Sequence, residues 1–97
     1  DATIIAATKE ILQAKLRDFS PDYILISAGF DPLDTDPLGG FDMTPAGFYE
    51  LAAHWREWAE RYAGGNICGV LEGGYDVGRL GDCVRGVLRA WAGLRPV

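Results

Sequence analysis

Histidine and cysteine, two common zinc ligands, are scarce in this sequence, which has one histidine, His54, and two cysteines, Cys68 and Cys83. A catalytic zinc site typically has three protein ligands. His54 falls in the middle of an expected helix beside Trp55, where a structural role is favoured over metal binding, so this chain alone supplies no convincing zinc site. The cysteines lie in apolar stretches and are not spaced as Cys-x-x-Cys. We therefore expect buried thiols in a reducing compartment, and hence a cytoplasmic protein.

Basic residues and long apolar runs are also in short supply. Nine Lys and Arg stand against 14 Asp and Glu, which gives a net charge of −5. A surface that coats DNA or RNA carries a basic stripe, so we expect no nucleic-acid partner. No apolar run approaches the roughly 18 residues of a membrane span, so we expect no membrane association. The acidity permits a cationic partner, such as a lysine-rich tail or a polyamine.

The sequence is long enough for one small globular domain, and 48% of its residues are hydrophobic. Two runs, at 23–26 and 67–71, are almost continuously apolar, which is typical of parallel strands covered on both faces. Two such strands make a marginal sheet, and their outer edges favour further strands. Because the only methionine is Met43, we expect a piece of a longer polypeptide whose other strands lie N-terminal to Asp1.

The order of the elements follows from periodicity and from helix-end signals. Apolar spacing predicts helices over 2–17, from 45 to about 62 and over about 77–92. Thr44-Pro45 provides a hydroxyl N-cap and a proline at the first helical position, and Asp76 is expected to cap the last helix. Helix, strand, helix, strand, helix is one βαβ crossover with flanking helices. The sequence therefore predicts a layered α/β fold with parallel strands, in a single domain over residues 1–97.

Polar groups follow both predicted strands, where open α/β sheets build their binding sites. Asp31 follows the first strand, and its carboxylate is a candidate ligand for a divalent metal. Tyr75 follows the second strand, and a phenol, protonated at neutral pH, can donate a hydrogen bond to a developing oxyanion. Two structural alternatives stay open from the residues alone. Asp31 could form an Asx turn, and Tyr75 could pack its ring under the sheet edge.

Two other ligand-binding motifs, a calcium-binding loop and a phosphate-binding turn, are excluded by the residues at their key positions. The loop over 34–45 would place Pro45 where a calcium-binding EF-hand has a bidentate glutamate, which excludes that site. Gly73-Gly74 precedes the last helix, as in a phosphate-binding turn. It lacks the G-x-G-x-x-G spacing, and Glu72 would repel an anion.

Taken together, three segments resemble the zinc-dependent deacetylase superfamily, which includes histone deacetylases, acetylpolyamine amidohydrolases and acetoin-utilisation proteins. They match the order and spacing of motifs in the C-terminal third of its catalytic domain. Their residues are more similar to those of class II-like and bacterial members than to those of class I. The resemblance implies a three-layer αβα fold with a parallel sheet, of the arginase/deacetylase type. The matching residues are Ile26-Ser27-Ala28-Gly29-Phe30-Asp31, then Asp36-Pro37-Leu38-Gly39-Gly40 with Met43-Thr44, and Leu71-Glu72-Gly73-Gly74-Tyr75.

The resemblance also implies roles for particular residues. Asp31 falls on a zinc-ligating aspartate of the family, and Tyr75 on the tyrosine that, with zinc, polarises the acyl carbonyl and steadies the tetrahedral intermediate. Gly73 and Gly74 fall on glycines beside the floor of the substrate tunnel, and Leu38 on a residue that lines the tunnel for the acyl-lysine.

The family's paired histidines and its Asp-x-His zinc ligands are absent and would lie upstream of Asp1. Asp36 matches a family position too, and there we expect a loop-structuring role. By resemblance, the complete protein binds Zn(II), activates water with a histidine and releases acetate from acetyl-lysine or acetylpolyamine substrates. This chain would then need the remainder of its own catalytic domain, and alone it should be inactive and bind zinc weakly.

Two other functions compete with the resemblance. One is a non-catalytic α/β module that binds a partner through its acidic surface or an exposed strand edge. The other is a nucleotide-binding half-domain, which Glu72 disfavours.

Overall fold

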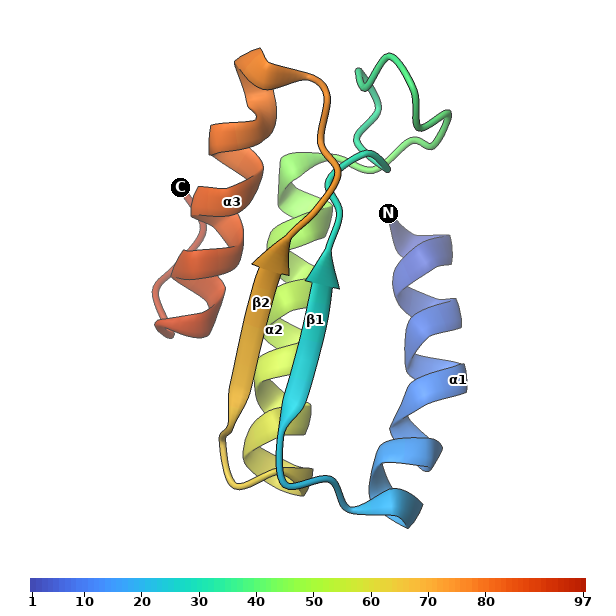
Figure 1. The fold of residues 1–97 in the computed structure, drawn as a ribbon, viewed down its shortest axis with the longest axis vertical. Helices are drawn as coiled ribbons and strands as arrows, with labels where there is room; N and C mark the ends of the chain where they lie inside the picture. Colours follow the sequence, from blue (N-terminus) through green and yellow to red (C-terminus); the bar gives the residue numbers. More distant parts are fainter.

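The computed structural model describes residues 1–97 and has the predicted order of elements (Figure 1). Two boundaries differ slightly from the prediction: the first helix continues to Phe19, and the first strand covers 24–28 instead of 23–26. No helix has the length and apolarity needed to cross a membrane. The elements are α1 (Ala2–Phe19), β1 (Ile24–Ala28), α2 (Pro45–Tyr62), β2 (Ile67–Leu71) and α3 (Val77–Trp91).

The two strands pair in parallel along their whole length. Ile24 lies opposite Ile67, and Ala28 lies opposite Leu71. The connection through α2 passes behind the sheet and is right-handed, as expected for a βαβ unit (Figure 1). Since both strands run the same way and end in register, the segments that follow them leave from one edge of the sheet.

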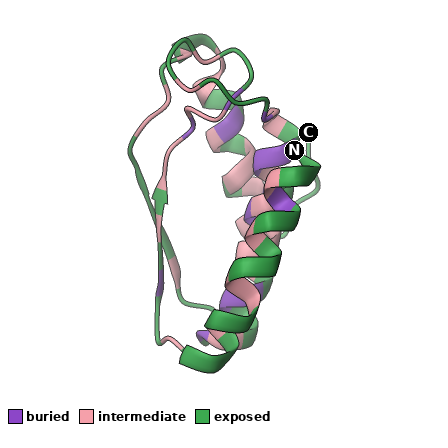
Figure 2. Ribbon diagram, turned by 90° about the vertical axis from the view of Figure 1, so that its right-hand side faces the viewer, coloured by how far each residue is buried: buried purple, intermediate pink, exposed green.

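All three helices lie on one side of this sheet (Figure 2). The other side is open: Leu25 is 74% exposed and Val70 is 60% exposed. These residues therefore form two of the layers in the expected αβα arrangement, and the third layer is not among them. The prediction of two buried thiols is wrong for Cys68. It pairs with Leu25 in the register and is exposed on the same open face, whereas Cys83 is buried in α3.

The main core lies beneath the segment that connects β1 to α2. Phe30 packs against Phe48 of α2, with ring centroids 5.1 Å apart, and both contact a buried cluster with Leu33, Met43 and Cys83. Leu33 and Met43 also form a parallel bridge, with the Met43 amide donating to the Pro32 carbonyl at 2.9 Å. The segment over 28–43 is thus anchored by three buried side chains, those of Phe30, Leu33 and Met43, and by backbone hydrogen bonds.

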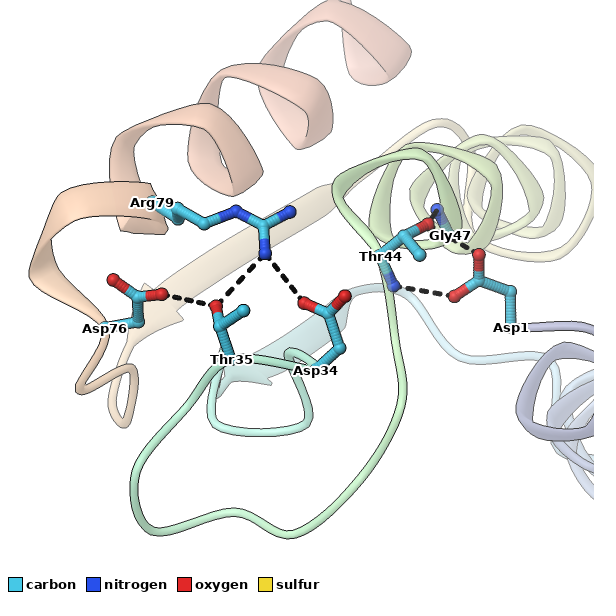
Figure 3. A network of polar contacts seen from close by, with 7 residues as sticks. All are labelled: Asp1, Asp34, Thr35, Thr44, Gly47, Asp76 and Arg79. Carbon is cyan, nitrogen blue, oxygen red and sulfur yellow. Dashed lines mark hydrogen bonds and ion pairs between the residues drawn. The ribbon is translucent and has the colours of Figure 1, made fainter.

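The helix ends confirm one predicted cap and revise another. The Thr44 hydroxyl accepts a hydrogen bond from the Gly47 amide at 3.1 Å, as an N-cap does. The Asp1 carboxylate in turn accepts from the Thr44 amide at 2.8 Å and from its hydroxyl at 2.6 Å (Figure 3). Asp76 occupies the N-cap position of α3 but makes no capping bond, because its carboxylate accepts from the Thr35 hydroxyl instead.

Candidate functional site

The segments that leave the two strands stay side by side beyond the ends of the strands. The Glu72 amide donates to the Ala28 carbonyl at 3.0 Å, and the Phe30 amide donates to the Gly73 carbonyl at 2.9 Å. These two hydrogen bonds join the segments beyond the strands, up to the residue before Asp31. The backbone at position 31 therefore lies beside the Gly73-Gly74 turn.

Asp31 and Tyr75 are brought together at Gly73. A Cβ on Gly73 would lie 2.8 Å from Oδ1 of Asp31 and 3.5 Å from Cε2 of Tyr75. A Cβ on Gly29 would also lie 2.8 Å from the same carboxylate oxygen. The Asp31 carboxylate is thus flanked by two glycines without side chains, and the Tyr75 ring lies against one of them. Tyr75 is 51% exposed, so its ring is not packed beneath the sheet edge.

The two other glycines near the site have different functions. Gly74 has a φ of 139°, and a Cβ there would lie 2.8 Å from Cδ1 of Leu80 and 3.1 Å from Cβ of Phe30. A side chain at position 74 would therefore collide with Leu80 and Phe30, and the positive φ favours glycine there. A Cβ on Gly39 would lie only 1.6 Å from the Asp31 carbonyl oxygen, so Gly39 packs directly on the Asp31 backbone.

Asp36 connects the loop after β1 to the turn after β2. Its Oδ1 accepts from the amides of Leu38 at 2.8 Å and Gly39 at 3.0 Å, which confirms the expected loop-structuring role. Its Oδ2 accepts from the Tyr75 amide at 2.7 Å. Burial raises the pKa of Asp36, but hydrogen bonds from the amides of Tyr75, Leu38 and Gly39 outweigh it, so the pKa lies below its ordinary value. The carboxylate is therefore charged at neutral pH.

A second set of contacts ties the same loop to the first turn of α3 (Figure 3). Arg79 donates through Nη1 to Oδ1 of Asp34 at 2.8 Å and to the Thr35 hydroxyl at 3.1 Å, and Asp76 accepts from that hydroxyl. The sequence predicts no role for Arg79, Asp34 or Thr35. No local pattern marks them, because the contacts join segments far apart in the chain.

The chain by itself offers a single carboxylate for a metal at this place. No group of three or more His, Cys, Asp or Glu side chains in the structure could hold a metal ion. His54 lies in α2, where its ring stacks on Trp58 with centroids 6.0 Å apart, in agreement with a structural role. Asp31 between two bare glycines leaves room for a metal and its other ligands to approach. It fits one ligand position of a zinc site.

Leu38 lies on the exposed part of the loop, with 71% of its surface accessible. Its amide is bonded to the same Asp36 carboxylate that binds the amide of Tyr75. Leu38, Asp31 and Tyr75 thus belong to segments joined by direct contacts, at the edge of the sheet where both strands end.

Comparisons with known proteins give one consistent result. The profile of the Histone deacetylase domain matches residues 1–91. The chain is 40% identical over 93 residues to Histone deacetylase 10, chloroplastic, of Oryza sativa subsp. japonica, which covers 96% of this chain and 21% of the relative. It is 38% identical over 84 residues to Polyamine deacetylase HDAC10 of Homo sapiens, which covers 87% of this chain and 12% of the relative.

The fold comparison agrees with the sequence comparison. The crystal structure of the HDA15 HD domain matches with a TM-score of 0.81 and 33% sequence identity, over 97% of this chain and 26% of that chain. The chain therefore spans about a quarter or less of these relatives. Since the domain profile covers nearly all of its residues, the chain belongs to the histone deacetylase family.

Proposed function

We propose that the complete protein is a zinc-dependent deacetylase, and that this chain supplies one zinc ligand and one hydrogen-bond donor to its active site. The substrates would be acetyl-lysine or acetylpolyamine-type amines. Two relatives named Histone deacetylase and Polyamine deacetylase support this substrate class. The observation that carries the proposal is the meeting of the Asp31 carboxylate and the Tyr75 ring at Gly73.

Asp31 would hold the metal through its carboxylate, and the other ligands would come from the rest of the catalytic domain. Bound Zn(II) acts as a Lewis acid on a carbonyl oxygen and lowers the pKa of bound water. The glycines at 29 and 73 flank the Asp31 carboxylate. Any side chain at either position would occupy the space beside the carboxylate that a metal needs.

Tyr75 would donate its hydroxyl proton in a hydrogen bond to the oxygen of the acyl group. Its ring and the Asp31 carboxylate both lie within 3.5 Å of the position of a Cβ on Gly73, so an acyl group above Gly73 would be close to both. Leu38 would contribute an apolar wall for the substrate, and Gly73 and Gly74 the floor. A preorganised donor of this kind typically contributes about 10²–10³ to kcat.

One experiment tests this assignment with two readouts. We expect the complete protein to release acetate from an acetyl-lysine peptide or an acetylated polyamine, and to lose this activity on treatment with a chelator. Zinc content, measured by elemental analysis, should fall in Asp31→Ala and stay unchanged in Asp42→Ala, which removes an exposed carboxylate from the same loop. A folded complete protein without chelator-sensitive activity, or an Asp31→Ala variant with full zinc, would refute the proposal.

A non-catalytic interaction module remains the second candidate, favoured by the open face of the sheet with Leu25 and Val70 exposed. The same exposure follows if other parts of the family domain cover that face, since the chain spans 26% of the matched HD-domain chain. If this candidate is right, the 97-residue chain alone should unfold cooperatively and stay monodisperse. The deacetylase proposal predicts that it aggregates or unfolds without the rest of the domain.

A further inference from the structure

We propose that Asp36 is a positioning residue for the reaction, which keeps the loop that carries Leu38 in register with the turn that carries Tyr75. This inference rests on the function proposed above. The inference rests on one observation: the two oxygens of the Asp36 carboxylate bind different segments. Oδ1 accepts from amides of the loop, and Oδ2 accepts from the Tyr75 amide.

The hydrogen bonds explain why a carboxylate is required at this position. Three amides, from Leu38, Gly39 and Tyr75, point at one side chain and donate over 2.7–3.0 Å. An ionised carboxylate accepts at both oxygens and has no donor to oppose an amide. An asparagine would place its NH₂ group against at least one of the three amides, and an alanine would leave all three without this partner.

The contact with Tyr75 is close enough to control where its phenol points. The hydrogen bond is made by the amide nitrogen of Tyr75 itself, which is bonded to the Cα that carries the side chain. A small rotation about this point moves the distant hydroxyl further than it moves the backbone. A misplacement of about 1 Å in a catalytic group can cost about 10²-fold in rate.

The loop that Asp36 holds through Leu38 and Gly39 also contacts Asp31, the expected metal ligand. Gly39, bonded to Oδ1 of Asp36, packs on the Asp31 carbonyl so closely that a Cβ would lie 1.6 Å from its oxygen. A single side chain therefore connects the turn of Tyr75 to the loop that lies against Asp31. Loss of Asp36 would separate the phenol from the carboxylate without removing either group.

The neighbouring Asp34 provides a matched control. It is an aspartate on the same loop, and it bonds to Arg79 at 2.8 Å instead of to any of the three amides. Asp34→Asn removes the charge of a loop carboxylate but leaves the Asp36 hydrogen bonds in place. It separates a general weakening of the loop from a specific displacement of Tyr75.

The experiment is a double-mutant cycle in the complete, zinc-loaded protein, with kcat and KM measured on an acetyl-lysine peptide. We expect Asp36→Asn to lower kcat by about 10–100-fold with unchanged zinc content, and Asp34→Asn to leave kcat within about twofold. In a Tyr75→Phe background, Asp36→Asn should cause little further loss of kcat, because the phenol that it positions is already missing.

Several results would overturn the inference. An Asp36→Asn variant with wild-type kcat would do so, and so would an equal fold-loss in the wild-type and Tyr75→Phe backgrounds, which would indicate a general structural effect. If Asp36→Asn does not fold, Asp36→Glu replaces it, with both oxygens kept but displaced by one methylene and the same expected dependence on Tyr75. An inactive wild-type protein refutes the proposed function and this inference together, whereas an active one with unaltered Asp36 variants refutes the positioning role alone.

Discussion

The carboxylate of Asp31 and the ring of Tyr75 both lie next to Gly73, at 2.8 Å and 3.5 Å from the position of a Cβ there, although they follow different strands. The parallel pairing of β1 and β2 and the bond between the Phe30 amide and the Gly73 carbonyl produce this proximity. The absence of a side chain at Gly73 leaves the space between them free.

Replacement of Gly73 by alanine should disturb both partners at once. The new Cβ would lie 2.8 Å from Oδ1 of Asp31, which is below normal contact distance, and 3.5 Å from the Tyr75 ring. We expect Gly73→Ala to lower the zinc content of the complete protein and to reduce kcat by at least tenfold. The control is Gly81→Ala in α3, where no atom lies within 4 Å of a new Cβ. This control should keep full activity and gain about 1 kcal/mol of stability, because alanine favours helices over glycine. Equal activity of the two variants would show that the space at Gly73 is not used.

Removal of the Tyr75 hydroxyl should affect turnover and leave the metal in place. We expect Tyr75→Phe to reduce kcat by roughly 10²–10³, the usual effect of losing an oxyanion donor, with zinc content unchanged. Tyr49→Phe is the matched control, since its hydroxyl donates to the Leu94 carbonyl at 2.9 Å, away from the site. Steady-state kinetics would measure kcat for both variants. A Tyr75→Phe enzyme as fast as the Tyr49→Phe control would exclude this role for the phenol.

The stabilisation from the hydrogen bonds that the Asp36 carboxylate accepts should be lost in acid. The pKa of Asp36 in the folded protein lies below its ordinary value of 3.8, because amide hydrogen bonds outweigh the effect of burial. The folded state therefore binds the proton more weakly than the unfolded state. The contribution of Asp36 to stability is complete above pH 3.8 and is lost as the pH falls through the lowered value. Thermal unfolding of wild type and Asp36→Asn should show a difference in Tm at neutral pH that shrinks below pH 3.8. A difference that grows towards acid would contradict this assignment of the shift.

The N-cap of α2 should contribute measurably to stability. Thr44 accepts from the Gly47 amide and also donates to Asp1, and both bonds are lost in Thr44→Ala. We expect a loss of about 1–2 kcal/mol in the free energy of unfolding, measured by urea denaturation of the complete protein. Thr44→Ser should keep most of the stability because it retains the hydroxyl. Thr3→Ala, at an exposed position inside α1, should change stability by less than about 0.5 kcal/mol. A Thr44→Ala variant as stable as wild type would mean that water replaces the cap at no cost.

Part of the fold could be predicted because its signals act over a few residues. The apolar periodicity of α2 and the Thr44-Pro45 start depend on neighbours within about one helical turn, and both agree with the structure. The two apolar strands indicated parallel pairing through the crossover rule, and the register confirms it. The absence of the cap expected at Asp76 could not be predicted from local signals. Asp76 has the right residue type and position for a cap, but the Thr35 hydroxyl, from a distant loop, takes its carboxylate.

By itself, then, the sequence determined the order of helices and strands, the family resemblance and the two side chains that leave the strand ends. These depend on residue type and on spacing along the chain. Tertiary structure decided which face of the sheet stays open at Cys68, how closely Asp31 approaches Tyr75, and that the Asp36 carboxylate binds the Tyr75 amide. Those contacts join segments distant in the chain, and they form only where packing and strand register bring donor and acceptor within hydrogen-bonding distance.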